Sequence, residues 1–435
     1  MPLAVASKAF IHPAFFPLNP FHLFYENCMP FFWDCWITDS EKDEPIHISA
    51  AQGQKLGELI AGAMETLPPS FCGPIHDPYQ KRQSQYKAFE WMALLHWYIL
   101  PIGIELGLNP QLLHVFSQFV TIIEFAMTIT PRSQEELDSL QVQVMRFLND
   151  YEFLYVNNDP NKVYRCCLCV FQLFHVPMHI RWFGSIRMGS QATVERSIGE
   201  VGHKIHSKKE PFANLTNIII EQECIRIAQE YYPQLRVGKD ARSPAKSHPA
   251  MPRLTQELHV RNVDPTHLDA IESFITAKYP DFQGAFSAHL YGKLSLPDGK
   301  TLKSQVSDEF SDATRKYRWF EAHLGGKRLY GEAVAFYHVE LAGGIISNVA
   351  IYKALTSINQ PYPTTIRGTW SPDSLNEVMD VSNIQTVVGI FTGPQSKNVY
   401  VLRKHPALML LRPEERGVRD VLDSDRYGEA DVELD

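Results

Sequence analysis

The stretch HVPMHIRWFGSIRMGSQATVERSIGEVGHKIHSKKEPFANLTNIIIEQE, residues 175–223, sets the expectations for the rest of the chain. It begins with an apolar segment that carries histidine, continues with the pair Glu195 and Arg196, and then becomes basic. The side chains of this basic loop are His203, Lys204, His206, Lys208 and Lys209. An acid shortly before a cluster of cations suits a site for a polyanion, where a carboxylate holds a metal ion or a proton beside phosphate groups.

The basic loop leaves two interpretations open. A run of charges is more often a solvated loop than a binding site, because water alone satisfies charged side chains. Alternatively the loop contacts the phosphate backbone of DNA, which its place shortly after Glu195 favours. Pro211 is expected to open a helix, and the backbone N–H groups of its first turn would add donors for phosphate.

Composition sets limits on the class of protein. The chain has 435 residues, of which 45% are hydrophobic, enough for two or three domains with their own cores. Its net charge of −8 excludes a generally basic DNA binder, so any contact with nucleic acid must be a local patch. The seven cysteines are odd in number and irregularly spaced, which favours a reducing, intracellular compartment. The prolines near Met1 interrupt any signal-peptide pattern.

Helical periodicity dominates the first half of the chain. The aromatic and apolar residues 1–36 predict a strand that ends near Asn19, and Asn19 is expected to cap a helix from about His22. A charged loop at 37–52 and an amphipathic helix at 53–66 follow. Further helices are predicted at 86–106, 110–129, 133–156, 162–182, 188–206 and 212–231.

Two of the predicted helices are apolar enough to raise the question of a membrane span. Each contains an acid, Glu105 in the first and Glu124 in the second. Neither reaches the run of about twenty apolar residues that a spanning helix needs. We therefore predict that both are buried core helices and that the protein has no membrane segment.

After the helical half the sequence changes character. Residues 237–254 are rich in Pro, Ser and basic residues, which is typical of a linker, and a short helix is expected at 265–278. Segments with β-branched and aromatic residues then predict the strands of a small β-barrel: 286–296, 328–341, 346–356, 364–370, 386–392 and 398–404. The fold class is thus α+β, with a β-rich domain at 255–412 that is separable from the helices and an acidic disordered tail at 413–435.

Residues 175–223 resemble the catalytic C-terminal region of CACTA-type (En/Spm-like) DNA transposases and their Kyakuja–Dileera–Zisupton relatives. That family has, in order, a His-rich helix, Gly-Pro, Glu-Arg, Gly, a basic segment and a Pro-Phe-Ala-x-Leu-like turn. The matching positions here are His175, Gly184-Ser185, Glu195-Arg196, Gly199, the lysines of the basic loop and Pro211-Phe212-Ala213-Asn214-Leu215. A Ser stands where the family has Pro, at Ser185.

A second resemblance lies near the N-terminus. FPLNPFHLFYENCMPFFWDCW, residues 16–36, is similar to the family's Leu-Asp-x-x-His-Leu-x-x-x-Asn segment. The residues that fit are His22, Leu23, Glu26 and Asn27. Asn19 stands where the family has its second metal-binding Asp. Together with the helices between them, the two segments cover about the first half of the chain.

The resemblance implies an RNase H-like core in which three acids hold two Mg²⁺ ions that act on transposon-end DNA. Glu195 would be the third acid and a metal ligand, with His175, His22 and Arg196 as its neighbours. The first Asp is not found, and Asn19 lacks the charge of the second, so one of the three acids survives. The implied remnant of the core is 1–36 and 161–236, with 37–160 as a helical insertion.

The functional prediction is a partial, catalytically inactive transposase-derived protein with residual DNA binding, which needs Mg²⁺ only if it is active. The alternative is a domesticated, non-enzymatic adaptor that binds DNA or chromatin. Either protein would be intracellular and nuclear, with DNA and a second copy of the chain as candidate partners. These predictions follow from the resemblance and not from composition or periodicity.

A zinc site and a packed core are the two interpretations of the cysteines and histidines at 166–179. His175 and His179 lie four residues apart, with Cys166, Cys167 and Cys169 shortly before them. A Cys-x₂-Cys pair is missing and a proline separates the histidines, so the pattern does not match a zinc motif. Packed cysteines and a hydrogen-bonded histidine are the favoured interpretation.

Overall fold

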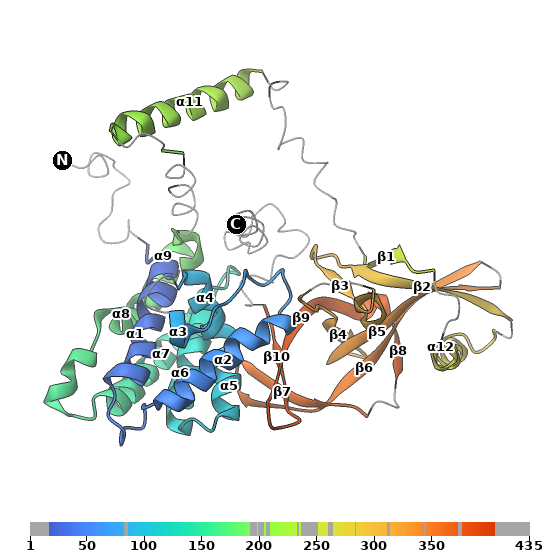
Figure 1. Ribbon diagram of the computed structural model, residues 1–435, viewed down its shortest axis with the longest axis horizontal. Coiled ribbons are helices and arrows are strands. Elements are labelled where there is room, and N and C mark those ends of the chain that lie inside the picture. Colours follow the sequence, from blue (N-terminus) through green and yellow to red (C-terminus); the bar gives the residue numbers. More distant parts are fainter. Residues whose placement is uncertain are drawn as a thin grey trace. The chain divides into compact units, whose positions relative to one another are not determined.

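A computed structural model describes the chain in segments that form two compact units. The described segments are 17–81, 86–191, 198, 204–205, 209–232, 235, 251–259, 264–282, 284–310, 314–342, 344–372 and 376–404. The first unit is Met1–Gly189 with Pro249–Asp435, and the second is Ser190–His248. The first unit contains a group of helices and an antiparallel sheet (Figure 1), so the predicted α+β class is confirmed.

The N-terminal segment that resembles the family, residues 16–36, is called the first motif below, and residues 175–223 are called the second motif. The described part of the first motif lies at the start of a long helical segment. The π-helical turn η2 (Phe21–Cys28) continues into α1 (Met29–Asp34) and then into η3 (Cys35–Asp39), because the residues at both junctions keep helical dihedral angles. The predicted helix from about His22 is therefore confirmed. The strand expected to end near Asn19 lies mostly outside the described residues, and 17–19 belong to no strand.

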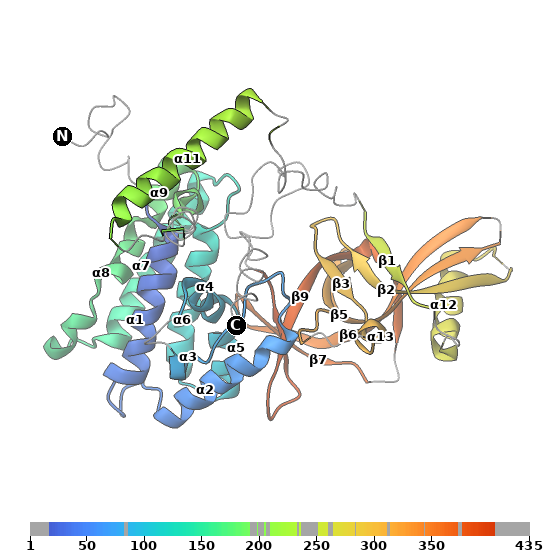
Figure 2. The ribbon, with the colours of Figure 1, turned by 45° about the horizontal axis from the view of Figure 1, so that its top comes forward.

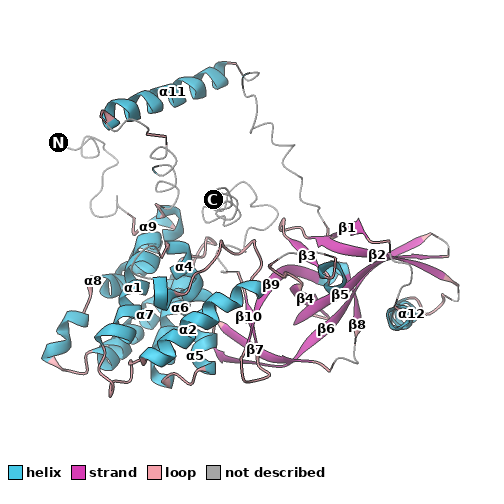
Figure 3. Cartoon of the chain, in the orientation of Figure 1, coloured by secondary structure: helices cyan, strands magenta, loops and turns pink. Residues whose placement is uncertain are grey.

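The long helices of the first unit follow their capping signals. Ser49 and Ser133 form capping boxes with Gln52 and Glu136, and Asn109 caps α6 through its side chain. The helices predicted at 53–66, 86–106, 110–129 and 133–156 are all found (Figure 3). Their bounds are α2 (Ala50–Gly62) with η4 (Ala63–Thr66), α3 (Pro78–Lys81), α4 (Ala88–Ala93), η5 (Leu94–Tyr98), α5 (Ile99–Glu105), α6 (Pro110–Ala126) and α7 (Gln134–Tyr155).

The prediction of one continuous helix at 162–182 is wrong. This segment consists of η6 (Pro160–Arg165), α8 (Leu168–Phe171), η7 (Gln172–His175) and α9 (Val176–Phe183), followed by η8 (Ile186–Gly189). Cys166 leaves the helical conformation with φ −72° and ψ 60°, and Gly184 ends α9 with φ 78°. Pro177 lies in the first turn of α9, where the missing N–H of proline costs no hydrogen bond. Apolar residues continue at a helical spacing through the whole segment, so the sequence pattern does not indicate these breaks.

A buried ion pair joins three parts of the helical group. The guanidinium of Arg165, only 1% exposed, donates to both carboxylate oxygens of Glu44 at 2.9 and 3.0 Å. It also donates to the carbonyls of Asp39 at 2.8 Å and Tyr155 at 3.0 Å. The ends of η3 and α7 are thereby held against η6. Trp36 adds a hydrogen bond of 2.7 Å to the Tyr155 hydroxyl.

The sheet contains every strand segment that the sequence predicted. The strands are β1 (Arg253–Glu257), β2 (Phe286–Ser295), β3 (Thr301–Lys303), β4 (Trp319–Leu324), β5 (Lys327–Leu341), β6 (Ile345–Tyr362), β7 (Thr365–Trp370), β8 (Glu377–Asp380), β9 (Ile384–Thr392) and β10 (Val399–Leu402). Neighbours pair in the order β1-β2-β5-β4-β9-β10-β7-β6-β8, β3 pairs with β2, and β5 also pairs with β6. The predicted helix is found as α12 (Pro265–Lys278), and a shorter one is α13 (Gln305–Asp308).

Sequence analysis missed the short or polar strands β1, β3, β4 and β8. One of them, β1, begins at Arg253, inside the predicted linker 237–254. Residues 237–250 of that linker lie outside the described residues. The turn between β2 and β3 does follow the sequence signal, because Gly299 has φ 84° after Pro297 and Asp298.

The helices and the sheet of the first unit are in direct contact. The carboxylate of Glu105, at the end of α5, accepts hydrogen bonds from Ser396 at 2.8 Å, Asn398 at 2.9 Å and Tyr400 at 2.8 Å. Trp97 donates to the Arg403 carbonyl at 2.7 Å. Both views of the ribbon show the helical group beside β7 and β9 (Figure 2), and Figure 1 shows β10 there as well. Separate stability of the β-rich part stays a prediction.

The second unit contains the predicted helix at 212–231, found as α11 (Pro211–Tyr231). None of the α11 side chains is buried. Most of the helix predicted at 188–206 lies outside the described residues. Across the ranges that the structure describes, no helix has the length and apolar character to cross a membrane.

The buried ion pair predicts a pH-dependent stability. Burial alone would raise the pKa of Glu44, but hydrogen bonds from Arg165 and Lys162 outweigh it and lower the pKa from 4.5 to about 2. The contribution of Glu44 is therefore complete above about pH 4.5 and is lost as the pH falls toward 2. Glu44→Gln should lower the free energy of unfolding by about 3–5 kcal/mol at pH 7, measured by urea titration.

The difference between Glu44→Gln and the parent protein should shrink as the titration is repeated from pH 7 down to pH 3. Glu58→Gln is the matched control, since Glu58 is exposed and pairs with Lys55 at 3.1 Å within one helix. Its effect should stay below about 1 kcal/mol. Equal effects of the two changes at pH 7 would contradict the role of the Arg165–Glu44 pair.

Candidate functional site

Asn19 lies two residues before the start of η2 and its side chain interacts with that helix. Its Oδ1 accepts a hydrogen bond from the backbone N–H of Phe21 at 3.2 Å, and its Nδ2 contacts Nδ1 of His22. Its carbonyl accepts from the N–H of Leu23 at 3.0 Å. Asn19 thus makes a local bond to the start of the helix, although Pro20 is the residue at the N-cap position of η2. The amide oxygen that could ligate a cation is thus engaged by the backbone.

His22 lies between Asn19 and an acid. Its Nε2 is 3.2 Å from a carboxylate oxygen of Glu26, one helical turn farther along. Both side chains are partly exposed, at 34% and 39%. The first motif therefore presents an amide, an imidazole and a carboxylate in a row, of which the carboxylate supplies the negative charge.

The described part of the second motif contacts the first motif. The backbone N–H of Leu18 donates to Nδ1 of His179 at 3.4 Å, across 161 positions of sequence. A Cβ placed on Gly189 would lie 2.8 Å from Cβ of Pro17 and 3.0 Å from the carbonyl oxygen of Leu18. The segment before Asn19 thus lies between α9 and η8. Glycine at position 189 is required by this close approach.

Burial prepares His179 to accept the hydrogen bond from Leu18. His179 is 8% exposed. Burial is the main cause that lowers its pKa, and the nearby His175 lowers the pKa further. The ring is therefore neutral at neutral pH, and Nδ1 is an acceptor when the proton is on Nε2. The ring also stacks on Phe183 with centroids 6.0 Å apart. Sequence analysis assigned the role near the acids to His175, which is exposed, whereas His179 makes the contact.

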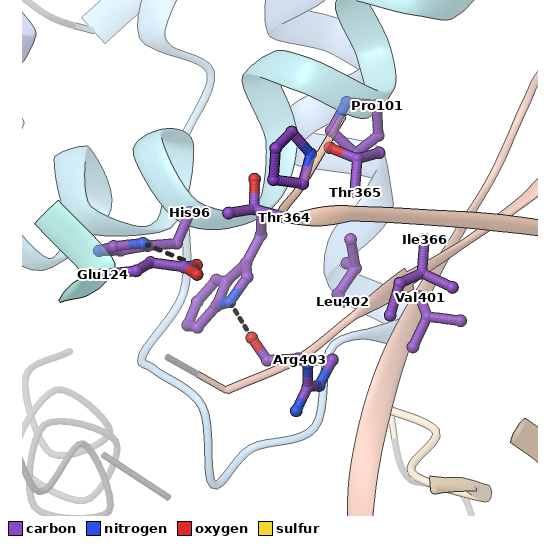
Figure 4. Close-up of a pocket in the computed structure, with 11 residues that line it drawn as sticks. His96, Pro101, Glu124, Thr364, Thr365, Ile366, Val401, Leu402 and Arg403 are labelled. Atoms are coloured by element: carbon purple, nitrogen blue, oxygen red, sulfur yellow. Dashed lines mark hydrogen bonds and ion pairs between the residues drawn. The ribbon is translucent and has the colours of Figure 1, made fainter. Parts of the chain in front are cut away.

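Polar contacts connect Tyr25 of the first motif with two buried or partly buried side chains of the helical group, His96 and Glu124. The hydroxyl of Tyr25 is 3.3 Å from Nε2 of His96, and Nδ1 of His96 is 3.7 Å from Glu124 (Figure 4). Burial lowers the pKa of His96 to about 3, so this ring is neutral. Burial raises the pKa of Tyr25, and the positive charge of Arg187 in η8 opposes that increase.

Glu124 stands out in the sequence as an acid within an apolar helix, but the sequence alone does not connect it with a site. The available signal was an acid and a histidine on helices predicted to be buried, since buried polar groups need partners. The cavity beside His96 and Glu124 has a volume of about 50 Å³ and is also lined by Trp97 and Arg403 (Figure 4). That volume suits water and excludes an organic substrate.

The remaining predicted site residues divide into two groups. Lys204 and Lys209 are exposed in the second unit, and Pro211 opens α11 as expected. The others lie outside the described residues: Glu195, Arg196, His203, His206 and Lys208. The structure therefore brings Leu18, the residue before Asn19, into contact with His179 of α9, and Glu195 lies outside the described residues.

No metal site emerges among the residues that are described. No group of three or more His, Cys, Asp or Glu side chains there could hold a metal ion. Among the described residues, His175 and His179 do not form a metal-binding group with the cysteines that precede them. No protein-family model, no curated protein and no solved structure matches the chain. Functional inference therefore depends on the contacts given above.

The contact of Gly189 with the first motif predicts a position that does not accept a side chain. Gly189→Ala should lower the free energy of unfolding by about 1–3 kcal/mol, because the new methyl group overlaps Pro17 and Leu18. The exchange rate of the Leu18 amide proton, measured by NMR, should rise as its bond to His179 weakens. Gly62→Ala is the control, since a Cβ there meets no atom within 4 Å. Equal effects of the two changes would refute the close packing.

Proposed function

We propose that the chain is a DNA-binding protein derived from a CACTA-type transposase and that it lacks strand-transfer activity. The observation that supports this is the hydrogen bond of 3.4 Å between Leu18 and His179. It joins the two segments that resemble the family, although 161 positions separate them. Two short segments that resembled one family by chance would have no reason to meet in the fold.

The chemistry of Asn19 supports the loss of activity. The parent reaction is cleavage and strand transfer of transposon-end DNA, for which bound Mg²⁺ supplies charge to the reacting phosphate. Mg²⁺ depends on anionic oxygen ligands, and the amide of Asn19 carries no charge. Its oxygen already accepts from Phe21 at 3.2 Å, and the nearest acid along the helix, Glu26, pairs with His22. The described residues thus do not fit a magnesium site.

The architecture of the proposal follows the family. Residues 1–36 and 161–236 form the remnant of an RNase H-like core, and 37–160 form the helical insertion. The sheet is a small barrel that serves interactions. Strand pairing supports the barrel, because the pairings run β5-β4-β9-β10-β7-β6 and return through β6–β5. Closure of this kind removes exposed strand edges.

The DNA contact of the proposal is the basic loop, with nuclear localisation and self-association as further parts. The net charge of −8 means that binding must come from a local cluster of cations. Lys204 and Lys209 support this assignment because both are exposed to solvent. A domesticated adaptor for DNA or chromatin would keep the same contact without the chemistry, and the neutral Asn19 favours this variant.

The first test of the proposal is enzymatic. The purified protein should not nick duplex DNA that carries transposon ends, with either Mg²⁺ or Mn²⁺, because the charge of the second acid is missing. Asn19→Asp should not be sufficient to restore nicking if the first acid is also lacking. Metal-dependent nicking by the parent protein that disappears in Glu195→Gln would overturn the loss of activity.

The second test addresses the DNA contact. Binding to an arbitrary duplex should weaken as salt rises, and the slope of log K against log salt should fall by about one for each phosphate that the protein no longer neutralises. Replacing Lys204, Lys208 and Lys209 with Ala should therefore reduce the slope by up to about three. The control replaces the exposed Lys42, Lys55 and Lys327, which changes net charge equally. An equal reduction of the slope in both variants would mean that binding follows total charge.

A further inference from the structure

Three cysteine thiols converge where the first motif helix meets α8. The Sγ atoms of Cys167 and Cys169 are 3.2 Å apart, on either side of the first residue of α8. Cys28, the last residue of η2, donates its S–H to the carbonyl oxygen of Cys169 at 3.4 Å. Cys28 is buried, whereas Cys167 and Cys169 are partly exposed. Two of the three cysteines are thus partly exposed to solvent.

The surroundings give the thiols different acidities. The side chain of Cys28 lowers the pKa of Cys169 most, burial opposes it, and the side chain of Cys167 is a further cause that lowers the pKa, to about 7. Burial raises the pKa of both Cys28 and Cys167. Burial also raises the pKa of the neighbouring Cys166. The thiolate is the reactive form of cysteine, so Cys169 is the nucleophile of the group.

We propose that Cys169 and Cys167 form a reversible dithiol site that hydroperoxides oxidise to a disulfide. The geometry carries the proposal, because a disulfide needs its sulfurs about 2.05 Å apart and these start at 3.2 Å, on residues that flank Leu168 at the start of α8. The site is independent of the DNA-binding function. The site lies where η2 contacts α8. Oxidation would therefore change the packing of the first motif, which contains η2, against α8.

The reaction balances in two steps. The Cys169 thiolate attacks one oxygen of the peroxide, the O–O bond breaks, and hydroxide (or alkoxide) leaves; sulfur is oxidised to a sulfenic acid and the peroxide is reduced. The sulfur of Cys167 then attacks the sulfur of Cys169, an S–S bond forms, the S–O bond breaks, and water leaves with the thiol proton. A dithiol reductant reverses the oxidation by thiol–disulfide exchange.

Oxidation can be followed by mass. The full-length protein is treated with a small excess of hydrogen peroxide, its remaining thiols are alkylated, and it is digested with trypsin. Cys166, Cys167 and Cys169 share the tryptic peptide 166–181, whereas Cys28 lies in the peptide 9–42. A disulfide between Cys167 and Cys169 therefore leaves the peptide 166–181 with one alkyl group in place of three, and its mass is about 2 Da below that of the singly alkylated peptide with two free thiols. A disulfide from Cys28 would join the two peptides instead.

Single substitutions decide between the assignments. Cys169→Ser should abolish the oxidation, and Cys167→Ser should stop it at a sulfenic acid that a 1,3-diketone traps. Cys166→Ser is the matched control and should change nothing. The rate should rise about tenfold between pH 6 and pH 8 as the thiolate of Cys169 forms. Peptides joined through Cys28, or unchanged oxidation in Cys169→Ser, would overturn the proposal.

Discussion

The guanidinium of Arg165 determines how the helical group is put together. A buried charge is tolerated only when its donors find acceptors, and here the acceptors come from separate parts of the chain. Glu44 supplies both carboxylate oxygens, and the carbonyls of Asp39 and Tyr155 complete the set at 2.8 and 3.0 Å. The end of η3, the end of α7 and η6 are therefore fixed together.

This arrangement reaches the candidate site because the elements are continuous. The helix that ends at Asp39 begins at Phe21, two residues after Asn19. The segment that begins with η6 continues through α8 to α9, which carries His179. The ion pair thus holds the far ends of the two segments whose near ends meet at Leu18. Cys28 and Cys169 lie within these two segments, between the ion pair and the contact at Leu18 along the chain.

Much of the secondary structure could be predicted from the sequence, for physical reasons. Strands such as β5 and β9 carry long runs of β-branched and aromatic residues, and α12 starts with an Asp cap followed by Pro265. The missed strands are short, and β1 has a polar sequence whose pairing with β2 supplies the stability that its own residues do not. The break at Cys166 directly follows Arg165, whose buried side chain makes tertiary contacts that periodicity does not report.

The candidate site divides in the same way. The bond of Asn19 to the start of the helix could be predicted because it is a local interaction. The partner of Leu18 could not, since His175 and His179 lie about one helical turn apart in the same motif, and burial selected His179. The polar chain from Tyr25 to His96 and Glu124 joins three separate helical elements, and one sequence holds no signal for such a pairing.

Magnitudes indicate why the two motif segments meet. Closing a loop of 161 residues costs about 4–5 kcal/mol of chain entropy, whereas one hydrogen bond contributes about 1 kcal/mol net. The bond between Leu18 and His179 therefore cannot bring the segments together by itself. Packing of the intervening helices must hold them, with the aromatic core around Phe32 and the Arg165–Glu44 pair as its parts. The contact at Leu18 reports on that packing, and it should be among the first to open when the packing weakens.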